Sequence, residues 1–273
     1  MDDMTTTYRT VRRLRYDTKL RLLQVRAVER ITPKMKRITL GGDELAGFVS
    51  AAHDDHVKLF LPPPGQEKPV LPTLGPTKLV FPDGAARPVA RDYTPRRYDA
   101  AANTLAIDFV LHGDGPATSW AAQAKPGQLL GVGGPRGSFI VPNGFDWYLL
   151  VGDETALPAI GRRLEELPPG ARALVVIEVA DADEEQRFDT RTRLDARWLH
   201  RCGAEPDASL LTKAVAALTL PRGDGYAWLA TEASAARALR RHLVEERGLR
   251  RDRVRASAYW RRGAMATHET YDD

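Results

Sequence analysis

The chain changes its sequence pattern once, near residues 142–144, and this change constrains the fold more than any other feature. Before it, short apolar or alternating runs are separated by Pro and Gly turns, which is typical of a small antiparallel barrel. After it, apolar runs alternate with helical segments, which is typical of a parallel α/β sheet. The pattern predicts two domains: an antiparallel β-barrel over residues 1–143, whose first 19 residues form a mobile tail, and an α/β domain over residues 144–273.

The expected elements follow from hydrophobic periodicity and from turn residues. Strands of the first domain are expected at residues 20–29, 35–40, 56–61, 89–94, 104–111 and 129–132. A loop is expected at 62–88, because repeated Pro removes the donors that a strand needs. In the second domain, strands are expected at 146–151, 173–179, 226–230 and 254–259, and helices at 155–167, 210–218 and 234–246.

Composition excludes several classes of protein. The chain has 273 residues, one Cys, and 40 Lys and Arg against 36 Asp and Glu, a formal net charge of +4. A single Cys excludes an intramolecular disulfide and an iron–sulfur cluster held by cysteines alone. The net charge is modest and no helix-turn-helix or RNP-like motif accompanies it, so no nucleic acid partner is expected. The six histidines show no metal-ligand spacing, so no structural metal is expected.

The N-terminal sequence and the apolar runs indicate where the protein is found. No apolar run approaches the roughly 18 residues of a membrane span. The first residues are charged but are not followed by the apolar core of a signal peptide. We therefore expect a cytoplasmic protein without a membrane span.

The first candidate site is the run Arg91-Asp92-Tyr93-Thr94-Pro95-Arg96, at the end of an expected barrel strand. Residues two apart in an extended strand point to the same face, so Arg91 and Tyr93 would lie together. A guanidinium can pair with a phosphate or carboxylate, and an aromatic ring can stack on a heterocycle. Thr94 adds a hydroxyl and an amide that can hydrogen-bond a heterocycle nitrogen. The spacing alone equally permits a surface strand with a tyrosine in the core.

The second candidate site is the segment 112–120, HGDGPATSW. It is typical of a turn followed by a short helix. The exposed first amides of such a helix, together with the hydroxyls of Thr118 and Ser119, can hold a pyrophosphate. An ordinary helix start with Trp120 in the core fits the same residues.

The third candidate site is the segment 149–160, in which an apolar strand is followed by a single Gly and a helix. Open parallel sheets bind nucleotides at such a turn. The segment lacks a G-x-G-x-x-G fingerprint. The acidic pair Asp153 and Glu154 at the helix start would also oppose a bound phosphate, although it suits the helix dipole.

Taken together, these segments resemble one protein family. Arg91-Asp92-Tyr93-Thr94-Pro95-Arg96 resembles the R-x-Y-T-x-R flavin motif of the siderophore-interacting proteins, FAD-dependent ferric-siderophore reductases of the ferredoxin-reductase-like superfamily. Five further segments resemble family segments in the same order: 54–60, 112–120, 133–137, 152–155 and 258–263. The resemblance spans residues 25–263 and implies an N-terminal FAD-binding barrel and a C-terminal NAD(P)H-binding α/β domain.

The resemblance implies roles for individual residues. Arg91 would hold the FAD phosphate, Tyr93 would pack on the flavin, and Thr94 would lie near the flavin N5, so Tyr93 and Thr94 are the expected catalytic residues. The other expected FAD contacts are Asp108, His112, Ala117, Thr118, Ser119 and Trp120. In the second domain, Asp153, Glu154 and Thr155 would line the face where the reduced nicotinamide docks.

Four cations match family segments that border the substrate pocket: Lys58, Arg136, Arg261 and Arg262. Converging cations would concentrate an anionic ferric siderophore. The same residues are equally compatible with ordinary surface cations. Strand alternation permits only one of Arg261 and Arg262 to face the pocket, and the sequence does not decide between them.

The function implied by the resemblance is NAD(P)H-dependent reduction of ferric siderophores through FAD, with release of Fe²⁺. The acidic run 180–185 stands where NADPH-preferring relatives carry Ser and Arg, which favours NADH, although Arg162, Arg163 and Arg172 are near enough in sequence to reverse this. A ferredoxin is an alternative electron donor. The alternative functions are a general NAD(P)H flavin or quinone reductase of the same superfamily and a non-enzymatic siderophore-binding module.

Overall fold

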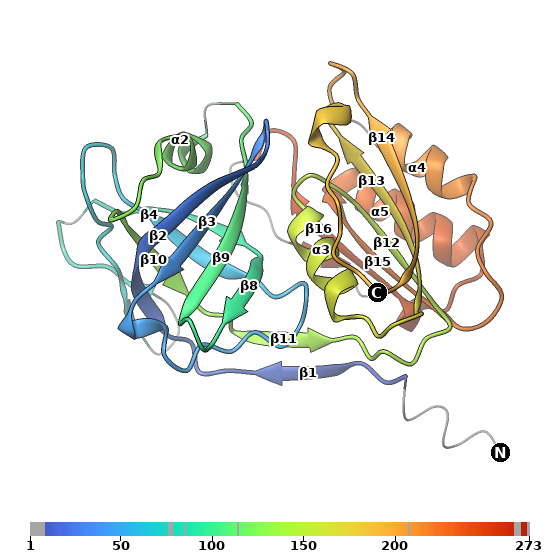
Figure 1. Cartoon of the computed structure of the whole chain (residues 1–273), viewed down its shortest axis with the longest axis horizontal. Coiled ribbons are helices and arrows are strands. Elements are labelled where there is room, and N and C mark those ends of the chain that lie inside the picture. The colour runs from blue at the N-terminus through green and yellow to red at the C-terminus, as the bar shows by residue number, and fades with distance from the viewer. Residues whose placement is uncertain are drawn as a thin grey trace. The chain divides into compact units, whose positions relative to one another are not determined.

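The structure, a computed structural model, describes residues 9–75, 79–84, 86–113, 115–206, 208–264 and 269–271. These residues form two compact units (Figure 1). The first unit is Val11–Val141, and the second is Pro142–Asp273 together with the residues before Val11. Asp114, His268 and residues 1–8 of the expected tail lie outside the described residues.

The first unit is built on a seven-stranded antiparallel sheet with the order β7-β4-β10-β2-β3-β9-β8. In that order, the strands are Val89–Tyr93, Val57–Leu61, Leu129–Gly133, Leu20–Thr32, Met35–Gly41, Thr104–Val110 and Pro95–Asp99. β7 and β8 are the two edges of the sheet, yet only Thr94 separates them in the chain. The sheet therefore curls until its edges meet at Thr94, and the predicted barrel-like unit is confirmed.

The core of the first unit lies on the inner face of this curled sheet. On β2, Leu23 and Val25 are buried while their neighbours are partly exposed, the period of two expected of a strand with one covered face. The helix α2 (Pro116–Gln123) adds Ala117 and Ala121 to the same core. The predicted loop at 62–88 contains two short paired strands, β5 (Thr73–Leu74) and β6 (Leu79–Val80).

Of the predicted mobile tail over residues 1–19, the described part, residues 9–19, includes an ordered strand, which corrects the prediction there. β1 (Arg12–Arg15) pairs with β11 (Gly137–Ile140), and the backbone N–H of Tyr16 donates to the carbonyl of Arg136 at 2.9 Å. All four side chains of β1 are exposed, so its basic composition is that of a solvated strand. Composition misses this strand because the backbone ladder that forms it is independent of side-chain polarity.

The second unit contains a six-stranded sheet with the order β14-β13-β12-β15-β16-β17, parallel except for β17. In that order, the strands are Arg193–His200, Arg172–Val179, Trp147–Asp153, Gly225–Glu232, Val254–Trp260 and Glu269–Tyr271. All seven residues of β12 are buried, as expected of a strand covered on both faces. The predicted α/β unit is confirmed. In the described part of the chain, no helix has the length and apolarity to cross a membrane.

Three helices cover this sheet: α3 (Leu157–Glu166), α4 (Ala208–Ala216) and α5 (Ala233–Arg241) (Figure 1). α4 and α5 share one face, where they form one apolar cluster with Leu149 of β12. α3 lies on the other face, where the guanidinium of Arg163 is 5.0 Å from the ring of Tyr148. The edge strand β14 was not predicted, because its exposed, charged side chains hide its strand pattern.

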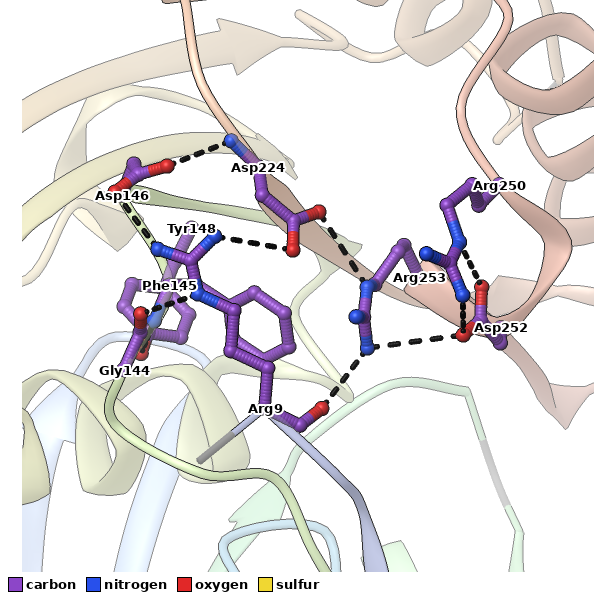
Figure 2. A network of polar contacts seen from close by, with 9 residues as sticks. All are labelled: Arg9, Gly144, Phe145, Asp146, Tyr148, Asp224, Arg250, Asp252 and Arg253. Carbon is purple, nitrogen blue, oxygen red and sulfur yellow. Dashed lines mark hydrogen bonds and ion pairs between the residues drawn. The ribbon is translucent and has the colours of Figure 1, made fainter. Parts of the chain in front are cut away.

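Arg9 joins the second unit through a network of ion pairs (Figure 2). Its Nη2 is 2.8 Å from Oδ1 of Asp146, and its Nη1 is 3.1 Å from Oδ2 of Asp224. Arg253 donates to the backbone carbonyl of Arg9 at 2.9 Å. The ring of Phe145 lies 5.8 Å from the Arg9 guanidinium and 4.9 Å from that of Arg253. Asp146, Asp224 and Arg253 each directly precede a parallel strand, so the network lies at the amino-terminal edge of the sheet.

Candidate functional site

The R-x-Y-T-x-R segment forms the seam where the two edges of the first sheet meet. Arg91 and Tyr93 lie two residues apart on β7, and Thr94, only 7% exposed, links β7 to β8. Nη1 of the half-buried Arg91 donates to the backbone carbonyl of Ala90 at 2.8 Å. Among the described residues no carboxylate pairs with Arg91, so its positive charge is available to an anionic ligand.

A row of aromatic rings connects this seam to α2. The ring of Tyr93 lies 4.4 Å from that of Phe109 on β9, and Phe109 lies 5.6 Å from Trp120 on α2. Phe109 is fully buried, whereas Tyr93 and Trp120 are half-buried. Burial raises the pKa of the Tyr93 phenol, and the charge of Arg91 opposes this only in part. The phenol therefore stays neutral near neutral pH and can donate a hydrogen bond.

The start of α2 is open. Its N-cap is Gly115, which provides no side-chain cap, its first residue is Pro116, and its first turn has no acidic residue. A Cβ placed on Gly113 or Gly115 would meet no atom within 4 Å. The first amides of α2 therefore lack a side-chain cap and carry the positive end of the helix dipole, which suits a phosphate.

The remaining residues predicted in this segment lie around the same turn. The hydroxyl of Thr118 is 3.1 Å from the carbonyl of His112 and 3.4 Å from that of Val110, so it closes the loop onto β9. His112 and Ser119 are exposed. Nε1 of Trp120 is buried and has no hydrogen-bond partner among the described residues, a cost that an acceptor on a bound cofactor would relieve.

Asp108 was predicted among the FAD contacts, but its carboxylate is already occupied. It is 4% exposed and accepts two hydrogen bonds from Arg37 on the neighbouring strand, Nε to Oδ1 at 2.7 Å and Nη2 to Oδ2 at 2.8 Å. Nε of Arg96 lies 3.9 Å from its Oδ2. The Asp108 carboxylate therefore pairs with Arg37 and lies near Arg96, which links three strands of the sheet.

Two of the four predicted cations lie in the first unit, near one end of β4 and β10. Lys58 is paired in register with Gly133 on one side and with Asp92 on the other. Its Nζ is 2.6 Å from Oδ1 of Asp92, which offsets its charge. Arg136, three residues after Gly133, is exposed and has no acidic partner among the described residues.

The other two predicted cations follow β16 in the second unit. Nη2 of Arg261 is 2.8 Å and 2.9 Å from the two carboxylate oxygens of Glu269. Arg262 is exposed, and in the described ranges no carboxylate pairs with its side chain. The charge of Arg262 is therefore available to a ligand, whereas the charge of Arg261 is offset by Glu269.

In the second unit, the chain leaves β12 at the point where the strand order reverses. β13 lies on one side of β12 and β15 on the other, the arrangement at which open parallel sheets bind nucleotides. Gly152 allows α3 to pack closely here, because a Cβ would lie 2.3 Å from Cβ of Ala156 and 2.6 Å from the carbonyl of Ala230.

Asp153 lies inside this turn and is saturated with hydrogen bonds. Its Oδ1 accepts from the amide and the hydroxyl of Thr155, at 2.9 Å and 2.5 Å. Its Oδ2 accepts from the hydroxyl of Thr231 and from Nε1 of Trp260, both at 2.8 Å. The residue is 4% exposed. Asp153 and Thr155 therefore fix the turn to β15 and β16.

Glu154 is neutralised by Arg201, a residue that the sequence did not single out. The Arg201 guanidinium contacts both carboxylate oxygens of Glu154 and lies 3.3 Å from Oε1 of Glu178. Burial raises the pKa of Glu178 to about 7, although Arg201 opposes the shift. The acidic pair at the start of α3 is therefore less repulsive to a phosphate than the sequence indicates. Arg201 was missed because β14, which delivers it, was not predicted.

The arginines that were considered as partners for a 2′-phosphate lie elsewhere. Arg162 pairs with Glu166 on its own helix at 2.7 Å. Arg163 is buried and donates to the carbonyl of Pro142 at 3.2 Å. Arg172 begins β13, at the amino-terminal edge of the sheet, whereas nucleotides bind at the carboxyl edge.

Comparison with known proteins adds independent information. The family model for the siderophore-interacting FAD-binding domain matches residues 24–139, and the model for the siderophore-interacting protein matches residues 145–263. The chain is 40% identical to the NADPH-dependent ferric-chelate reductase of Escherichia coli, over 94% of this chain and 99% of that protein. It is 34% identical to a ferric vibriobactin reductase of Vibrio cholerae, over 89% of this chain and 90% of that protein.

The structure is similar to solved structures as well. A siderophore utilization protein from T. fusca superposes with a TM-score of 0.86 at 45% identity, covering 93% of this chain and 97% of that one. The FAD/NAD-binding domain of a nitric oxide dioxygenase from Vibrio cholerae, at 13% identity, shares the ferredoxin-reductase-like fold alone, with a TM-score of 0.63. Two matched family models and close relatives over nearly the full length lead to one conclusion: the chain belongs to the siderophore-interacting protein family, and its first unit is an FAD-binding domain.

Proposed function

We propose that the protein is a flavin-dependent ferric-siderophore reductase that takes electrons from NAD(P)H. The relatives named as ferric-chelate and ferric vibriobactin reductases support this activity. The observation that carries the proposal is the seam itself. Arg91, whose guanidinium pairs with no carboxylate among the described residues, lies two residues from Tyr93 on β7, and aromatic contacts join the ring of Tyr93 through Phe109 to Trp120 of α2.

The residues at the seam fit FAD in charge and in shape. Arg91 and the first amides of α2 would bind the phosphates, and Tyr93 would pack on the flavin ring. Thr94 would offer its hydroxyl and amide to the ring edge. FAD held there would supply the redox chemistry, which is two-electron oxidation of NAD(P)H and one-electron reduction of Fe³⁺. The neutral phenol of Tyr93 favours packing on an uncharged ring, because no phenolate is formed near neutral pH.

The turn after β12 is the proposed docking site for the nicotinamide dinucleotide. Asp153 holds this turn through four hydrogen bonds and carries no exposed charge, and Arg201 offsets the charge of Glu154. The turn can therefore approach a pyrophosphate without strong repulsion. We assign Asp153 and Thr155 positioning roles here. Rates measured with NADH and with NADPH decide between the two donors.

The ferric siderophore is the substrate, and we propose that exposed cations attract its anionic forms. Arg136 carries more of this effect than Lys58, because Asp92 offsets the charge of Lys58. Arg136→Gln should therefore raise KM for an anionic ferric siderophore more than Lys58→Gln does, and neither should change KM for a neutral one. Equal KM changes for both substrates would contradict the electrostatic role.

Since the reaction consumes NAD(P)H, we further propose a cytoplasmic location, which cell fractionation tests.

A flavin titration tests the cofactor site. FAD is added to the purified protein, and binding is followed by the shift of the flavin absorption band. Arg91→Gln should weaken FAD binding by tenfold or more, because a charge-assisted bond to phosphate is lost. Arg97→Gln, an exposed arginine on the adjacent β8, is the matched control and should leave the affinity unchanged. A wild-type protein that does not bind FAD, or equal losses in both variants, would contradict the proposal.

A substrate comparison separates the proposed activity from its alternatives. Steady-state rates are measured with a ferric siderophore, with free flavin and with a quinone at matched concentrations. The proposal expects the highest kcat/KM for the ferric siderophore. A general flavin or quinone reductase would favour the other two substrates, and a binding module would bind the siderophore without oxidising NAD(P)H.

A further inference from the structure

A pocket rich in arginine lies on the second unit, and its lining residues differ from those of the proposed FAD and dinucleotide sites. Its volume is about 210 Å³. It is formed by α5, by the π-helical turn His242–Glu246 that continues it, by the 3-10 turn Arg251–Arg253 and by β17. The lining residues are Arg237, Arg240, Arg241, Val244, Glu245, Arg251 and Tyr271.

The lining has a large excess of positive charge, since four guanidinium groups face a single carboxylate, that of Glu245. In the described part of the chain, none of the four arginines forms an ion pair. Nε and Nη2 of Arg240 are buried and lack any hydrogen-bond partner among the described residues. Buried charged donors without partners cost free energy, which an anion in the pocket would recover.

Three of the four arginines come from α5, and the ring of Tyr271 packs against one of them. Arg237, Arg240 and Arg241 are three and four residues apart on α5, so they share one face of the helix. The guanidinium of Arg237 lies 5.3 Å from the centre of the Tyr271 ring. The hydroxyl of Tyr271 donates to Glu269 at 3.0 Å, which fixes the ring. Arg251 comes from a different element, so the donors approach from more than one direction.

The pocket is distinct from the proposed dinucleotide site because it lies at the opposite edge of the sheet. Arg251 begins the 3-10 turn that directly precedes β16, and Tyr271 pairs with Ala256, the third residue of that strand. Arg240 and Arg241 end the helix that runs back from the carboxyl end of β15. These residues therefore lie toward the amino-terminal edge, whereas Asp153 and Arg201 lie at the carboxyl edge.

We infer that this pocket binds a compact, phosphate-bearing anion. Guanidinium groups pair with phosphate through charge-assisted, often bidentate hydrogen bonds. The arginines of this pocket lie on two elements and so donate hydrogen bonds from two directions. The oxygens of a tetrahedral phosphate can accept hydrogen bonds from several directions, whereas the two oxygens of a carboxylate lie in one plane. A volume of about 210 Å³ is smaller than the roughly 300–1,000 Å³ of sites for drug-sized ligands. The pocket thus suits a phosphate or pyrophosphate group.

Calorimetric titration of the FAD-loaded protein with pyrophosphate, inorganic phosphate and citrate, at constant ionic strength, tests this inference. We expect saturable binding of one pyrophosphate per chain, weaker binding of phosphate, and little binding of citrate. Excess NAD⁺ should not displace the pyrophosphate. Arg240→Gln and Arg251→Gln, which alter two different elements, should each raise Kd by tenfold or more.

Arg193→Gln, an exposed arginine on the distant edge strand β14, is the matched control and should leave Kd unchanged. Thermal unfolding of each variant without ligand shows whether it is folded. The inference is overturned if pyrophosphate does not saturate, if NAD⁺ displaces it, if citrate binds as tightly, or if folded Arg240→Gln and Arg251→Gln proteins bind as the wild type does. None of these outcomes depends on ferric reductase activity.

Discussion

Replacing Arg9 with Met should destabilise the second unit, although Arg9 lies at the far end of the sequence from most of that unit (Figure 2). Its guanidinium makes three hydrogen bonds: to Asp146 at 2.8 Å, to Asp224 at 3.1 Å and to the carbonyl of Gly144 at 2.8 Å. Met retains the apolar stem and removes all three. It also leaves the carboxylates of Asp146 and Asp224 close together with one cation fewer.

The magnitude follows from the exposure of the partners. The Arg9 side chain is 17% exposed, but Asp146 is 47% and Asp224 is 32% exposed, so solvent screens both ion pairs. At about 0.5–1 kcal/mol for each of the three interactions, the loss is about 2 kcal/mol. For a unit of this size, roughly 4 °C of Tm corresponds to 1 kcal/mol, so we expect Tm to fall by about 8 °C.

Differential scanning calorimetry at low and high salt measures this effect. Arg12→Met, on the exposed strand β1, is the matched control and should change Tm by no more than about 1 °C. High salt should shrink the difference between wild type and Arg9→Met, because salt screens exposed pairs. If Arg9→Met and Arg12→Met unfold at the same temperature, Arg9 is not an anchor and the network does not stabilise the unit.

Three further predictions follow from the sites. Asp153→Asn replaces one accepting oxygen with an NH2 group, so one N–H, that of Thr155 or of Trp260, loses its acceptor; urea unfolding should show a loss of about 1–3 kcal/mol, and an unchanged midpoint would contradict this. Burial raises the pKa of Glu178 from 4.5 to about 7, so ionising it costs stability, and the wild type should lose stability relative to Glu178→Gln as pH rises through that window. A pH-independent difference would refute this. Asp92→Asn frees the charge of Lys58 and should lower KM for an anionic ferric siderophore roughly 1.5- to 5-fold, with no change for a neutral one.

The parts of the fold that the sequence predicts are those with strong local patterns. β12 and β13 are nearly continuous apolar runs, so they are recognised as buried parallel strands. β1 and β14 were missed because their side chains are charged and exposed, and only backbone pairing with distant strands defines them. The helix expected at 234–246 is α-helical only to Arg241 and continues as a π-helical turn, a change that residue periodicity does not reveal.

In the candidate site, too, the sequence predicts what depends on neighbouring residues and misses contacts between distant strands. The placement of Arg91 and Tyr93 on one strand could be predicted from the sequence because it depends on spacing within that strand. The hydrogen-bond partners of Asp153 could not, because Thr231 and Trp260 are 78 and 107 residues away. The ion-pair partners of Asp108 and Lys58, which are Arg37 and Asp92, could not be predicted either, because they lie on other strands.

Formation of Fe²⁺ tests the central claim most directly. Under anaerobic conditions, the protein is mixed with NAD(P)H and a ferric siderophore, with and without FAD, and Fe²⁺ is trapped by a coloured ferrous chelator. We predict rapid Fe²⁺ formation that requires both FAD and NAD(P)H and is largely lost in Arg91→Gln but not in Arg97→Gln. Fe²⁺ formation that is independent of FAD, or none with any ferric siderophore when FAD is bound, would contradict the account.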